Sequence, residues 1–507
     1  MNNYWYPVLM NELKELTPHM QLVYGGNRIA TVTPKLANDF KSGDRLIIVQ
    51  TTGDLLHIPA EAWNVANKAV SDAYDAFEKM GSITNQQISN FYDIFAQHLE
   101  EEHSFEPIIL TNEKDVLRAR ESGKPTERLI LSQKMRTEMI NGLRMWRDSK
   151  AVRGQVIETI EHPGWKVEQI HSGLGPVGFV FEGRPNVFAD ATGVLKTGNT
   201  VVFRIGSDAL STAKAIRQYA LDPALKKSGL PSGAVSLVAS ETHAAGWAMF
   251  SDHRLALAIA RGSGEAVNQL GAVARQTGIP VSLHGTGGAW ILATKTADPD
   301  DFINAITYSL DRKVCNTLNT LVITKDSIKH LKTALFQALE QVQKISKTHV
   351  KLHIVSEYKE LIPEVWFEKQ NFTINGTVKS EPQTDTIDIH AIGTEWEWDT
   401  HPELTITIAE DIDDAINLFN QYSSHFIASL ISNDPAEHTY CFDHIDSPFI
   451  GNGMTRWVDG QYALKRPELG LSNWEFGRLF SRGGVLSGDS IFTVRTRAFQ
   501  ENSELHR

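Results

Sequence analysis

The chain has 507 residues, of which 41% are hydrophobic and 22% are charged, and its formal net charge is −12. This length is too great for a single compact core, so a globular chain with two or three domains is expected. The acidic balance argues against a surface that binds nucleic acid or an anionic membrane, and no apolar run approaches the 18 residues of a membrane span.

The two cysteines, Cys315 and Cys441, stand far apart, which is not the spacing of a disulfide framework or of a metal-ligand cluster. The opening residues 1–6 lack the basic end and the apolar run of a signal peptide. We therefore expect a cytoplasmic protein with reduced cysteines, without a metal, and without nucleic-acid or membrane partners.

Residues 1–64 are predicted to form a small β-containing unit, because turn signals at 41–44 and 52–54 flank the apolar run 45–50. The role of this unit is open. From there to about residue 150 the apolar residues recur at three- and four-residue steps, which predicts packed helices without an evident site.

The segment Gly173–Gly178 matches G-x-G-x-x-G, the dinucleotide fingerprint, but its context is wrong. The true fingerprint follows a strand and opens a helix, whereas this segment precedes the predicted strand 177–181 and contains Pro176. The match is therefore interpreted as accidental.

Three strand–turn–helix units follow, with strands predicted at 177–181, 200–203 and 256–260. Such repeated units predict a doubly wound α/β sheet. Arg204 and small residues stand at the end of the second strand, where they suit a nucleotide phosphate or ribose at the carboxyl edge of the sheet.

Residues 282–288 lead into another predicted strand and are interpreted as a hinge into a second α/β domain. His284 in this hinge is a candidate base, and the alternative is a structural hydrogen-bonding role. The stretch 345–400 is predicted to be a looser, more polar segment, and Cys441 is assigned to the core.

Cys315 lies between a predicted helix at 302–310 and a predicted strand at 321–323. A thiol in such a turn is reachable, and nearby backbone N–H groups can stabilise the thiolate that acts as the nucleophile. The alternative is a small buried hydrophobic residue. Two later Gly- and Arg-rich stretches, 452–460 and 478–484, suit bidentate anion binding or are solvated loops.

Five stretches, in order, resemble the gamma-glutamyl phosphate reductase (glutamate-5-semialdehyde dehydrogenase) family of the aldehyde dehydrogenase superfamily, over residues 65–497. The family patterns Y-E-S/A-R-P-N-V, L-K-S/T-G-N-A-V-I-L-R-G-G, V-C-N, N-A-S-T-R-F-T-D-G and K-L-H-A-R-G-P correspond to residues 181–187, 195–206, 314–316, 452–460 and 478–484. This resemblance favours the nucleophilic interpretation of Cys315.

The resemblance implies an aldehyde-dehydrogenase-like α/β fold with a doubly wound nucleotide-binding domain and an α/β catalytic domain, preceded by the small N-terminal unit. The expected domains are 1–64 (extra unit), 65–282 (NADP binding), 283–445 (catalysis, with Cys315) and 446–507 (return to the nucleotide-binding domain and dimer interface). A homodimer is implied.

The resemblance also implies reduction of an acyl phosphate to an aldehyde with NADPH, or alternatively NADH. Cys315 would form a thioester, and the Asn186 side chain with the Cys315 N–H would form the oxyanion hole. The cofactor would be held by Arg204, Gly206, Ser207, Gly262 and Ser263, and the substrate by Arg184, Arg456 and Arg482. Because acyl phosphates are unstable, a kinase that supplies the acyl phosphate is an expected partner.

The sequence departs from the family where the family binds the glutamyl group: Phe480 replaces a His, Gly484 a Pro and Met454 a Ser. The substrate implied by the resemblance, with these departures, is gamma-glutamyl phosphate or a close analogue. The hinge also lacks the Glu with which hydrolytic aldehyde dehydrogenases activate water. Two alternatives remain open: an acyl-thioester reductase or aldehyde-oxidising dehydrogenase on the same fold, and a non-catalytic paralogue.

Overall fold

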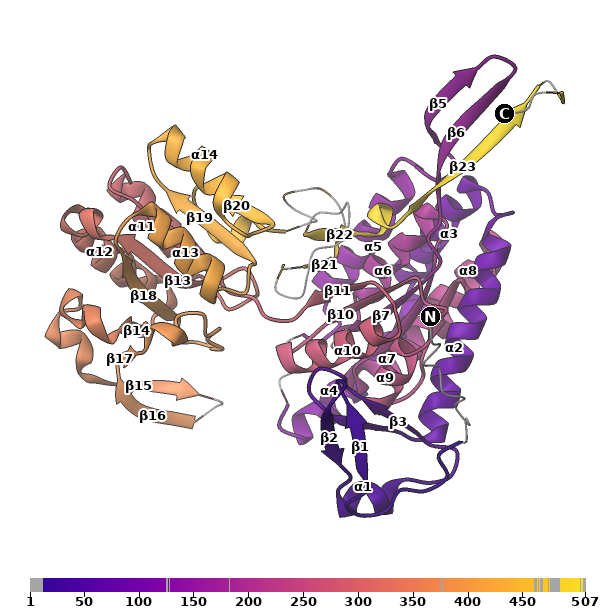
Figure 1. Cartoon of the computed structure of the whole chain (residues 1–507), viewed down its shortest axis with the longest axis horizontal. Coiled ribbons are helices and arrows are strands. Elements are labelled where there is room, and N and C mark those ends of the chain that lie inside the picture. The colour runs from indigo at the N-terminus through magenta and orange to yellow at the C-terminus, as the bar shows by residue number, and fades with distance from the viewer. Residues whose placement is uncertain are drawn as a thin grey trace, which may run out of the picture. The chain divides into compact units, whose positions relative to one another are not determined.

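The computed structural model describes residues 12–124, 126, 128–181, 183–374, 377–459, 463, 465, 468–472, 474, 484–501 and 503–504. The chain folds into two compact units, which are considered separately (Figure 1). One unit comprises Met1–Ser282 together with Ser487–Arg507, and the other comprises Leu283–Leu486.

The first unit begins with two antiparallel hairpins around a short helix, so the predicted β-containing segment is present. The elements are β1 (Gln21–Tyr24), β2 (Arg28–Thr31), α1 (Pro34–Asp39), β3 (Arg45–Ile48) and β4 (Leu55–Ile58). Thr33 accepts a hydrogen bond from the Leu36 N–H and so caps α1. Leu16, Val32 and Phe40 form a small core beneath the hairpins.

The predicted run of helices is α2 (Ala60–Met80), α3 (Asn85–Glu100), α4 (Glu102–Glu121) and α5 (Gln133–Asp148). In α2 the buried positions recur at helical spacing, and they are Ala62, Ala66, Ala69, Val70, Ala73, Ala76 and Met80. Small residues on this face let α2 lie close to the sheet, where it contacts β7, β8 and β9.

The central sheet of the first unit has the order β11-β10-β7-β8-β9. Its strands are β7 (Pro176–Phe181), β8 (Thr200–Ile205), β9 (Val235–Leu237), β10 (Leu257–Arg261) and β11 (Val281–His284), and the helices between them are α6 (Val187–Ala191), α7 (Leu210–Ile216), α8 (Asp222–Ser228), α9 (Ala244–Phe250) and α10 (Gly264–Gln276). The chain runs from β7 outward to β9 and then returns to place β10 on the other side of β7. This is the predicted doubly wound order, and the reversal lies between β7 and β10.

A second sheet of this unit joins segments that are far apart in the chain. β5 (Val156–His162), β6 (Trp165–Ser172) and β23 (Thr493–Gln500) are antiparallel, with β6 in the middle. Figure 1 shows these three strands extending together from the helices of the unit. The chain end thus returns to the first unit through β23.

The second unit is built on a seven-stranded sheet of order β17-β14-β18-β13-β12-β19-β20, in which every neighbouring pair is parallel. The strands are β12 (Ala289–Ala293), β13 (Leu318–Thr324), β14 (Lys351–Val355), β17 (Thr384–Ile387), β18 (Glu403–Ala409), β19 (Ile427–Ile431) and β20 (Phe449–Gly451). The helices are α11 (Pro299–Ser309), α12 (Ile328–Ser346), α13 (Ile412–Tyr422) and α14 (Pro435–His444). Both faces of the sheet carry buried apolar clusters, so the central strands are apolar along their whole length.

The stretch 345–400 is more regular than the sequence predicts. It contributes β14 and β17 to the main sheet and also the antiparallel hairpin β15 (Lys369–Ile374) and β16 (Thr377–Pro382). Two polar residues in β14 interrupt its apolar pattern, and both have acidic partners. Lys351 contacts Glu381 at 2.5 Å, and His353 contacts Glu403 at 2.9 Å.

The second unit begins at Leu283, within β11. It extends beyond residue 445, since β20 adds to its sheet and the return to the first unit begins at Ser487. The remaining short strands are β21 (Glu468–Leu471) and β22 (Val485–Ser487). In the described part of the chain, no helix is both long enough and apolar enough to cross a membrane.

Candidate active site

Cys315 lies on the loop that joins α11 to β13, as the sequence predicts. The Thr317 hydroxyl shapes this loop, because it accepts a hydrogen bond from the Val314 N–H at 2.9 Å and donates one to the Arg312 carbonyl at 2.6 Å. Cys315 is partly exposed and forms no disulfide, and it packs beside a small apolar cluster that includes Ala289 and Phe426. Its thiol is therefore reachable, whereas Cys441 is buried.

One side of the cysteine loop lies against the glycine pair that precedes β12. The Gly288 N–H donates a hydrogen bond of 2.9 Å to the Cys315 carbonyl, and the Ala289 N–H donates one of 2.9 Å to the Thr317 carbonyl. Gly288 has φ of +88°, and a Cβ on Gly287 would lie 2.8 Å from the Cys315 Cα. Only glycine at 287 leaves room for the backbone of the nucleophile.

A buried ion pair stands on the same side, and the sequence does not mark it. The Lys313 ammonium lies 2.7 Å from Glu395 Oε1, and the two side chains are 9% and 16% exposed. The other carboxylate oxygen of Glu395 accepts the Gly287 N–H at 2.6 Å. Glu395 thus links the glycine pair to the segment before Cys315. Lys313 and Glu395 are 82 positions apart in the chain.

His284, the candidate base, has its Nδ1 facing the Leu471 N–H at 3.2 Å. Because that nitrogen accepts a hydrogen bond, a neutral His284 carries its proton on Nε2. This contact is of the kind expected for the structural alternative.

The opposite side of the cysteine loop is held by the segment after β20, which contains the short 3-10 helix Thr455–Trp457. Arg456 forms an ion pair of 2.8 Å with Asp311 and also donates to the Asn316 side-chain oxygen. The structure thus brings Arg456 together with the residue next to Cys315. Arg482, the other arginine expected from the Gly- and Arg-rich stretches, lies outside the described residues.

In the first unit, the residues expected to bind the cofactor gather at the carboxyl edge of the sheet. Arg204 is in β8, where it pairs with Val180 of β7, and Gly206 and Ser207 follow β8 directly. Gly262 and Ser263 follow β10 and precede α10, and β10 pairs with β7 on its other side. These residues therefore flank the point where the strand order reverses, which is where ligands bind in such sheets.

Arg204 is 5% exposed, and burial lowers the pKa of its guanidinium. One terminal nitrogen donates to the Glu241 and Thr242 carbonyls at 3.4 and 3.2 Å, but the buried Nε has no hydrogen-bond partner. Ser263, at the start of the 13-residue helix α10, makes no capping hydrogen bond with its side chain. A buried donor without a partner and an uncapped helix end both fit an anionic nucleotide group.

Arg184 and Asn186 follow β7 at the same edge of the sheet, and Asn186 immediately precedes α6. The Asn186 side-chain oxygen is buried and has no hydrogen-bond partner. This oxygen is an acceptor, so a donor from outside its present surroundings would satisfy it. Asn186 belongs to the first unit and Cys315 to the second.

The model of the aldehyde dehydrogenase family matches residues 50–353. The chain belongs to the aldehyde dehydrogenase family. It is therefore an oxidoreductase of that superfamily, and its two parallel α/β sheets are the architecture expected for the family.

Within this family the chain is similar to gamma-glutamyl phosphate reductases. The protein of that name from Allorhizobium ampelinum is 28% identical over 389 residues, which cover 75% of this chain and 83% of the relative. The one from Bacillus anthracis is 26% identical over 378 residues, which cover 72% and 82%.

Solved structures show the same fold. The gamma-glutamyl phosphate reductase of Thermotoga maritima superposes with a TM-score of 0.74 at 22% identity and covers 87% of this chain and 100% of that chain. A lactaldehyde dehydrogenase gives a TM-score of 0.58 at 14% identity, covering 95% and 99%. An engineered glycolyl-CoA reductase with bound NADP⁺ gives 0.55 at 14% identity, covering 87% and 98%.

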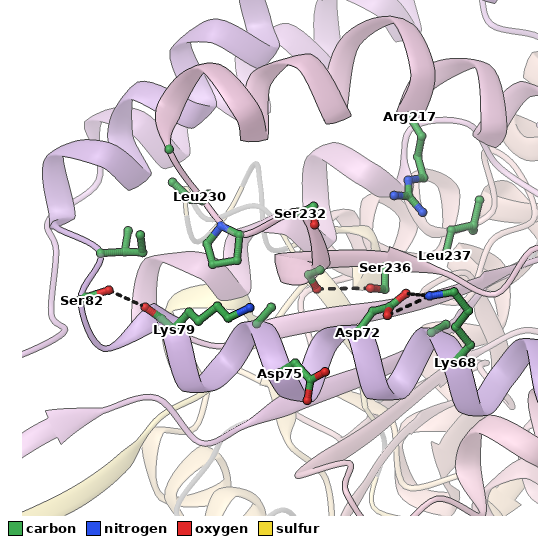
Figure 2. Close-up of a pocket in the computed structure, with 16 residues that line it drawn as sticks. Lys68, Asp72, Asp75, Lys79, Ser82, Arg217, Leu230, Ser232, Ser236 and Leu237 are labelled. Carbon is green, nitrogen blue, oxygen red and sulfur yellow. Dashed lines mark hydrogen bonds and ion pairs between the residues drawn. The ribbon is translucent and has the colours of Figure 1, made fainter.

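A cavity of about 700 Å³ in the first unit lies apart from these residues, beside the start of β9. Figure 2 shows that α2 lines one wall with Lys68, Asp72, Asp75 and Lys79, and that Ser232 and Arg217 stand across from it. Lys68 and Asp72 are paired at 2.8 Å, and none of the residues expected in the active site of the family lines the cavity. In the described residues, no group of three or more His, Cys, Asp or Glu side chains is arranged to hold a metal ion.

Proposed function

We propose that this member of the aldehyde dehydrogenase family reduces an acyl phosphate to an aldehyde, with Cys315 as the nucleophile. The observation that carries the proposal is the partly exposed Cys315 on a loop held at its own carbonyl by Gly288. The similarity to gamma-glutamyl phosphate reductases over about three quarters of the chain supports the acyl phosphate as the substrate class.

In the proposed reaction the Cys315 thiolate attacks the acyl carbon, and the bond to the phosphate oxygen breaks with its electron pair going to phosphate. The product is a thioester on Cys315. Hydride addition to the thioester carbon gives a thiohemiacetal, which releases the aldehyde as the C–S bond breaks and restores the thiolate. NADPH, when bound, supplies that hydride.

Oxygen in both tetrahedral species carries negative charge, which needs hydrogen-bond donors. We assign this role to the Asn186 side-chain amide and the Cys315 N–H. Removal of one such donor typically costs about 10²–10³ in rate. Asn186 follows β7, and its side-chain nitrogen is the donor that this role requires.

Arg204, Gly206, Ser207, Gly262 and Ser263 are proposed to hold the cofactor. The Arg204 guanidinium suits the ribose phosphate of NADPH, because it presents charged donors in a fixed planar array. NADH is the alternative cofactor, and the preference is to be decided by titration with both.

The substrate is proposed to be gamma-glutamyl phosphate or a close analogue, with its anionic groups bound by Arg184 and Arg482. Arg456 was expected to share this task. Its guanidinium instead contacts Asp311 and Asn316, and its role is considered below.

Both Glu395 oxygens accept donors from the protein, one from Lys313 and one from the Gly287 N–H. We therefore assign Glu395 to holding the glycine pair beside the cysteine loop.

We further propose that the protein acts in the reducing cytoplasm, where a thiolate nucleophile persists, and that it acts as a homodimer. A kinase that makes the acyl phosphate would be its supplying partner, since acyl phosphates hydrolyse in water. Full activity on a stable acyl thioester, with no kinase in complexes isolated from cells, would contradict that partnership.

The proposed function is tested most simply in the oxidative direction. Glutamate semialdehyde is mixed with NADP⁺ or NAD⁺ and with phosphate, with CoA or with neither, and the absorbance of the reduced cofactor is followed. The proposal predicts turnover that requires phosphate. Turnover that requires CoA would establish a thioester reductase, turnover without either acceptor would establish a hydrolytic dehydrogenase, and cofactor binding without turnover on a panel of aldehydes would favour the non-catalytic alternative.

A further inference from the structure

Asn316, the residue that follows Cys315, is held at both polar atoms of its side chain and at its backbone carbonyl by the segment after β20. Its side-chain nitrogen donates to the Val458 carbonyl at 2.8 Å, and its side-chain oxygen accepts from Arg456. Its backbone carbonyl accepts the Thr455 hydroxyl at 2.7 Å. Asn316 is 6% exposed, so these bonds form away from bulk water, where losing one partner is costly.

The guanidinium of Arg456 is held by two acceptors. Its Nε donates to Asp311 at 2.8 Å, and a terminal nitrogen donates to Asn316. The Arg456 side chain is 11% exposed. The preceding residue, Thr455, is fully buried, and its N–H donates to the Ser309 hydroxyl at 2.8 Å. The guanidinium therefore spans the cysteine loop from Asp311 to Asn316.

The loop is thus held from two sides that lie far apart in the chain. Gly288 binds the Cys315 carbonyl from one side, and the residues around Arg456 bind Asn316 from the other. The peptide group before Cys315 is held as well, because the Thr317 N–H donates to the Val314 carbonyl at 3.1 Å. Since the peptide groups on both sides of Cys315 are held, its backbone dihedrals are fixed, and with them the direction of its side chain. Arg456 holds the next residue, Asn316, and through it this part of the loop. A substrate anion would have to displace Asp311 or Asn316 to reach the nitrogens with which Arg456 holds them.

We propose that Arg456 is a positioning residue for Cys315, which orients the nucleophile through Asn316 and Asp311 and does not bind the substrate's anion. This inference rests on the proposed function only in taking Cys315 as the nucleophile. Arg456 acts through its neighbours, so its loss changes how the thiol is presented and leaves substrate affinity largely intact.

The test compares Arg456→Lys and Asp311→Asn in the full-length protein. Lysine keeps the charge but lacks the planar fork that contacts two acceptors, and Asp311→Asn removes the negative charge of the partner without touching the arginine. Lys325→Met is the matched control, because it breaks an exposed ion pair with Glu410 just beyond the other end of β13. Thermal unfolding of all variants separates misfolding from a local effect.

Two readouts are taken. The first is the rate at which iodoacetamide alkylates Cys315 in the absence of substrate and cofactor, read at that residue by peptide mass spectrometry over a range of pH. The second is kcat and KM for the acyl substrate. We expect Arg456→Lys to lower the alkylation rate and kcat at least tenfold and Asp311→Asn at least threefold, with KM changed less than threefold and the control unaffected.

A tenfold rise in KM for Arg456→Lys, with wild-type alkylation and a silent Asp311→Asn, would overturn the proposal and return Arg456 to substrate binding. Equal loss of melting temperature in both variants with unchanged alkylation would also overturn it, since that result describes a purely structural pair. If no acyl phosphate is turned over by the wild type, the proposed function fails, and the alkylation rates alone still decide the role of Arg456.

Discussion

The Gly288 N–H donates its hydrogen bond to the carbonyl of Cys315, so the residue before β12 fixes a residue on the loop that leads into β13. β12 and β13 are neighbours in the sheet, and the adjacent Ala289 N–H repeats the contact at Thr317. The backbone hydrogen bonds at Cys315 and Thr317 therefore continue the pairing of β12 with β13. Stability of the sheet and placement of the thiol are therefore linked.

Gly287→Ala should reduce activity strongly and lower stability. The added methyl group would lie 2.7 Å from the Cys315 carbonyl oxygen and 2.8 Å from its Cα, and these are backbone atoms that cannot move aside without displacing the loop. Overpacking of this kind costs about 1–3 kcal/mol. We expect a drop in kcat of at least tenfold, measured beside the melting temperature.

Gly453→Ala is the control for that variant, because nothing lies within 4 Å of a Cβ at that position in the same unit. It should keep kcat within twofold of the wild type. Wild-type kcat in Gly287→Ala would show that the loop moves freely and that the close approach is unimportant.

The Lys313–Glu395 pair should behave as a coupled unit. Removal of one partner from a buried ion pair leaves an uncompensated charge and typically costs about 3–5 kcal/mol, whereas removal of both costs less. We expect Lys313→Met to destabilise the protein more than the double change Lys313→Met with Glu395→Met. Denaturant unfolding of the two single variants and the double variant gives the coupling free energy.

Additive effects of the two changes would contradict this account, since they would show that the pair contributes no shared energy. Glu395→Gln is an informative companion. It keeps an acceptor for the Gly287 N–H but loses the charge that faces Lys313. Its free energy of unfolding should therefore lie between that of the wild type and that of Lys313→Met.

Arg204→Met should weaken cofactor binding with little effect on folding. The guanidinium is buried with an unpartnered Nε, so the folded protein without cofactor gains little from its charge. We expect the Kd for NADPH, measured by its fluorescence, to rise at least tenfold. The melting temperature without cofactor should stay the same or rise.

Arg254→Met provides a contrast in the same unit, since Arg254 is paired with Asp252 at 2.5 Å. It should lose stability and keep its NADPH affinity. An unchanged Kd in Arg204→Met would remove Arg204 from the cofactor site.

Cys441 should be inert at neutral pH because burial raises the pKa of its thiol to about 11. Iodoacetamide at pH 8 should label Cys315 and leave Cys441 unmodified, as read by peptide mass spectrometry. Labelling of Cys441 should increase about tenfold per pH unit up to pH 11, because the thiolate is the reacting form. Fast labelling of Cys441 at pH 8 would contradict its assignment to the core.

The raised pKa of Cys441 also lowers the free energy of unfolding at alkaline pH. The unfolded thiol, with a pKa of 9.0, loses its proton before the folded thiol does, so the unfolded state binds fewer protons between pH 9 and 11. The contribution of Cys441 is fully present below pH 9 and is lost as the pH rises through 11. Cys441→Ala should remove this part of the alkaline destabilisation.

The strands and the cysteine loop could be predicted because their signals are local. The apolar run that became β13 and the helix before it place Cys315 in a turn whatever the rest of the chain does. The doubly wound α/β class of the first unit likewise follows from its repeated strand–turn–helix pattern, whereas its strand order does not. β14 was missed because Lys351 and His353 make it look polar, and only their partners, at Glu381 and Glu403, allow them to be buried.

The contacts around Cys315 could not be predicted for the same reason. Arg456 in a Gly-rich stretch suggests an anion site, and only the fold brings it to Asp311, 145 positions earlier in the chain. Glu395 lies in no recognisable motif, and only its contacts with Lys313 and Gly287 place it beside the cysteine loop. Sequence periodicity reports burial along an element, whereas these pairings depend on how distant segments meet.

The central claim is that Cys315 carries the acyl group, and the most direct test is to capture it there. The enzyme is mixed with gamma-glutamyl phosphate made in place by a glutamate kinase and ATP, without NADPH, and is analysed by mass spectrometry of the intact protein and its peptides. We expect one glutamyl adduct on Cys315, removed by hydroxylamine and absent in Cys315→Ala. An adduct on another residue, or turnover that persists in Cys315→Ala, would contradict it.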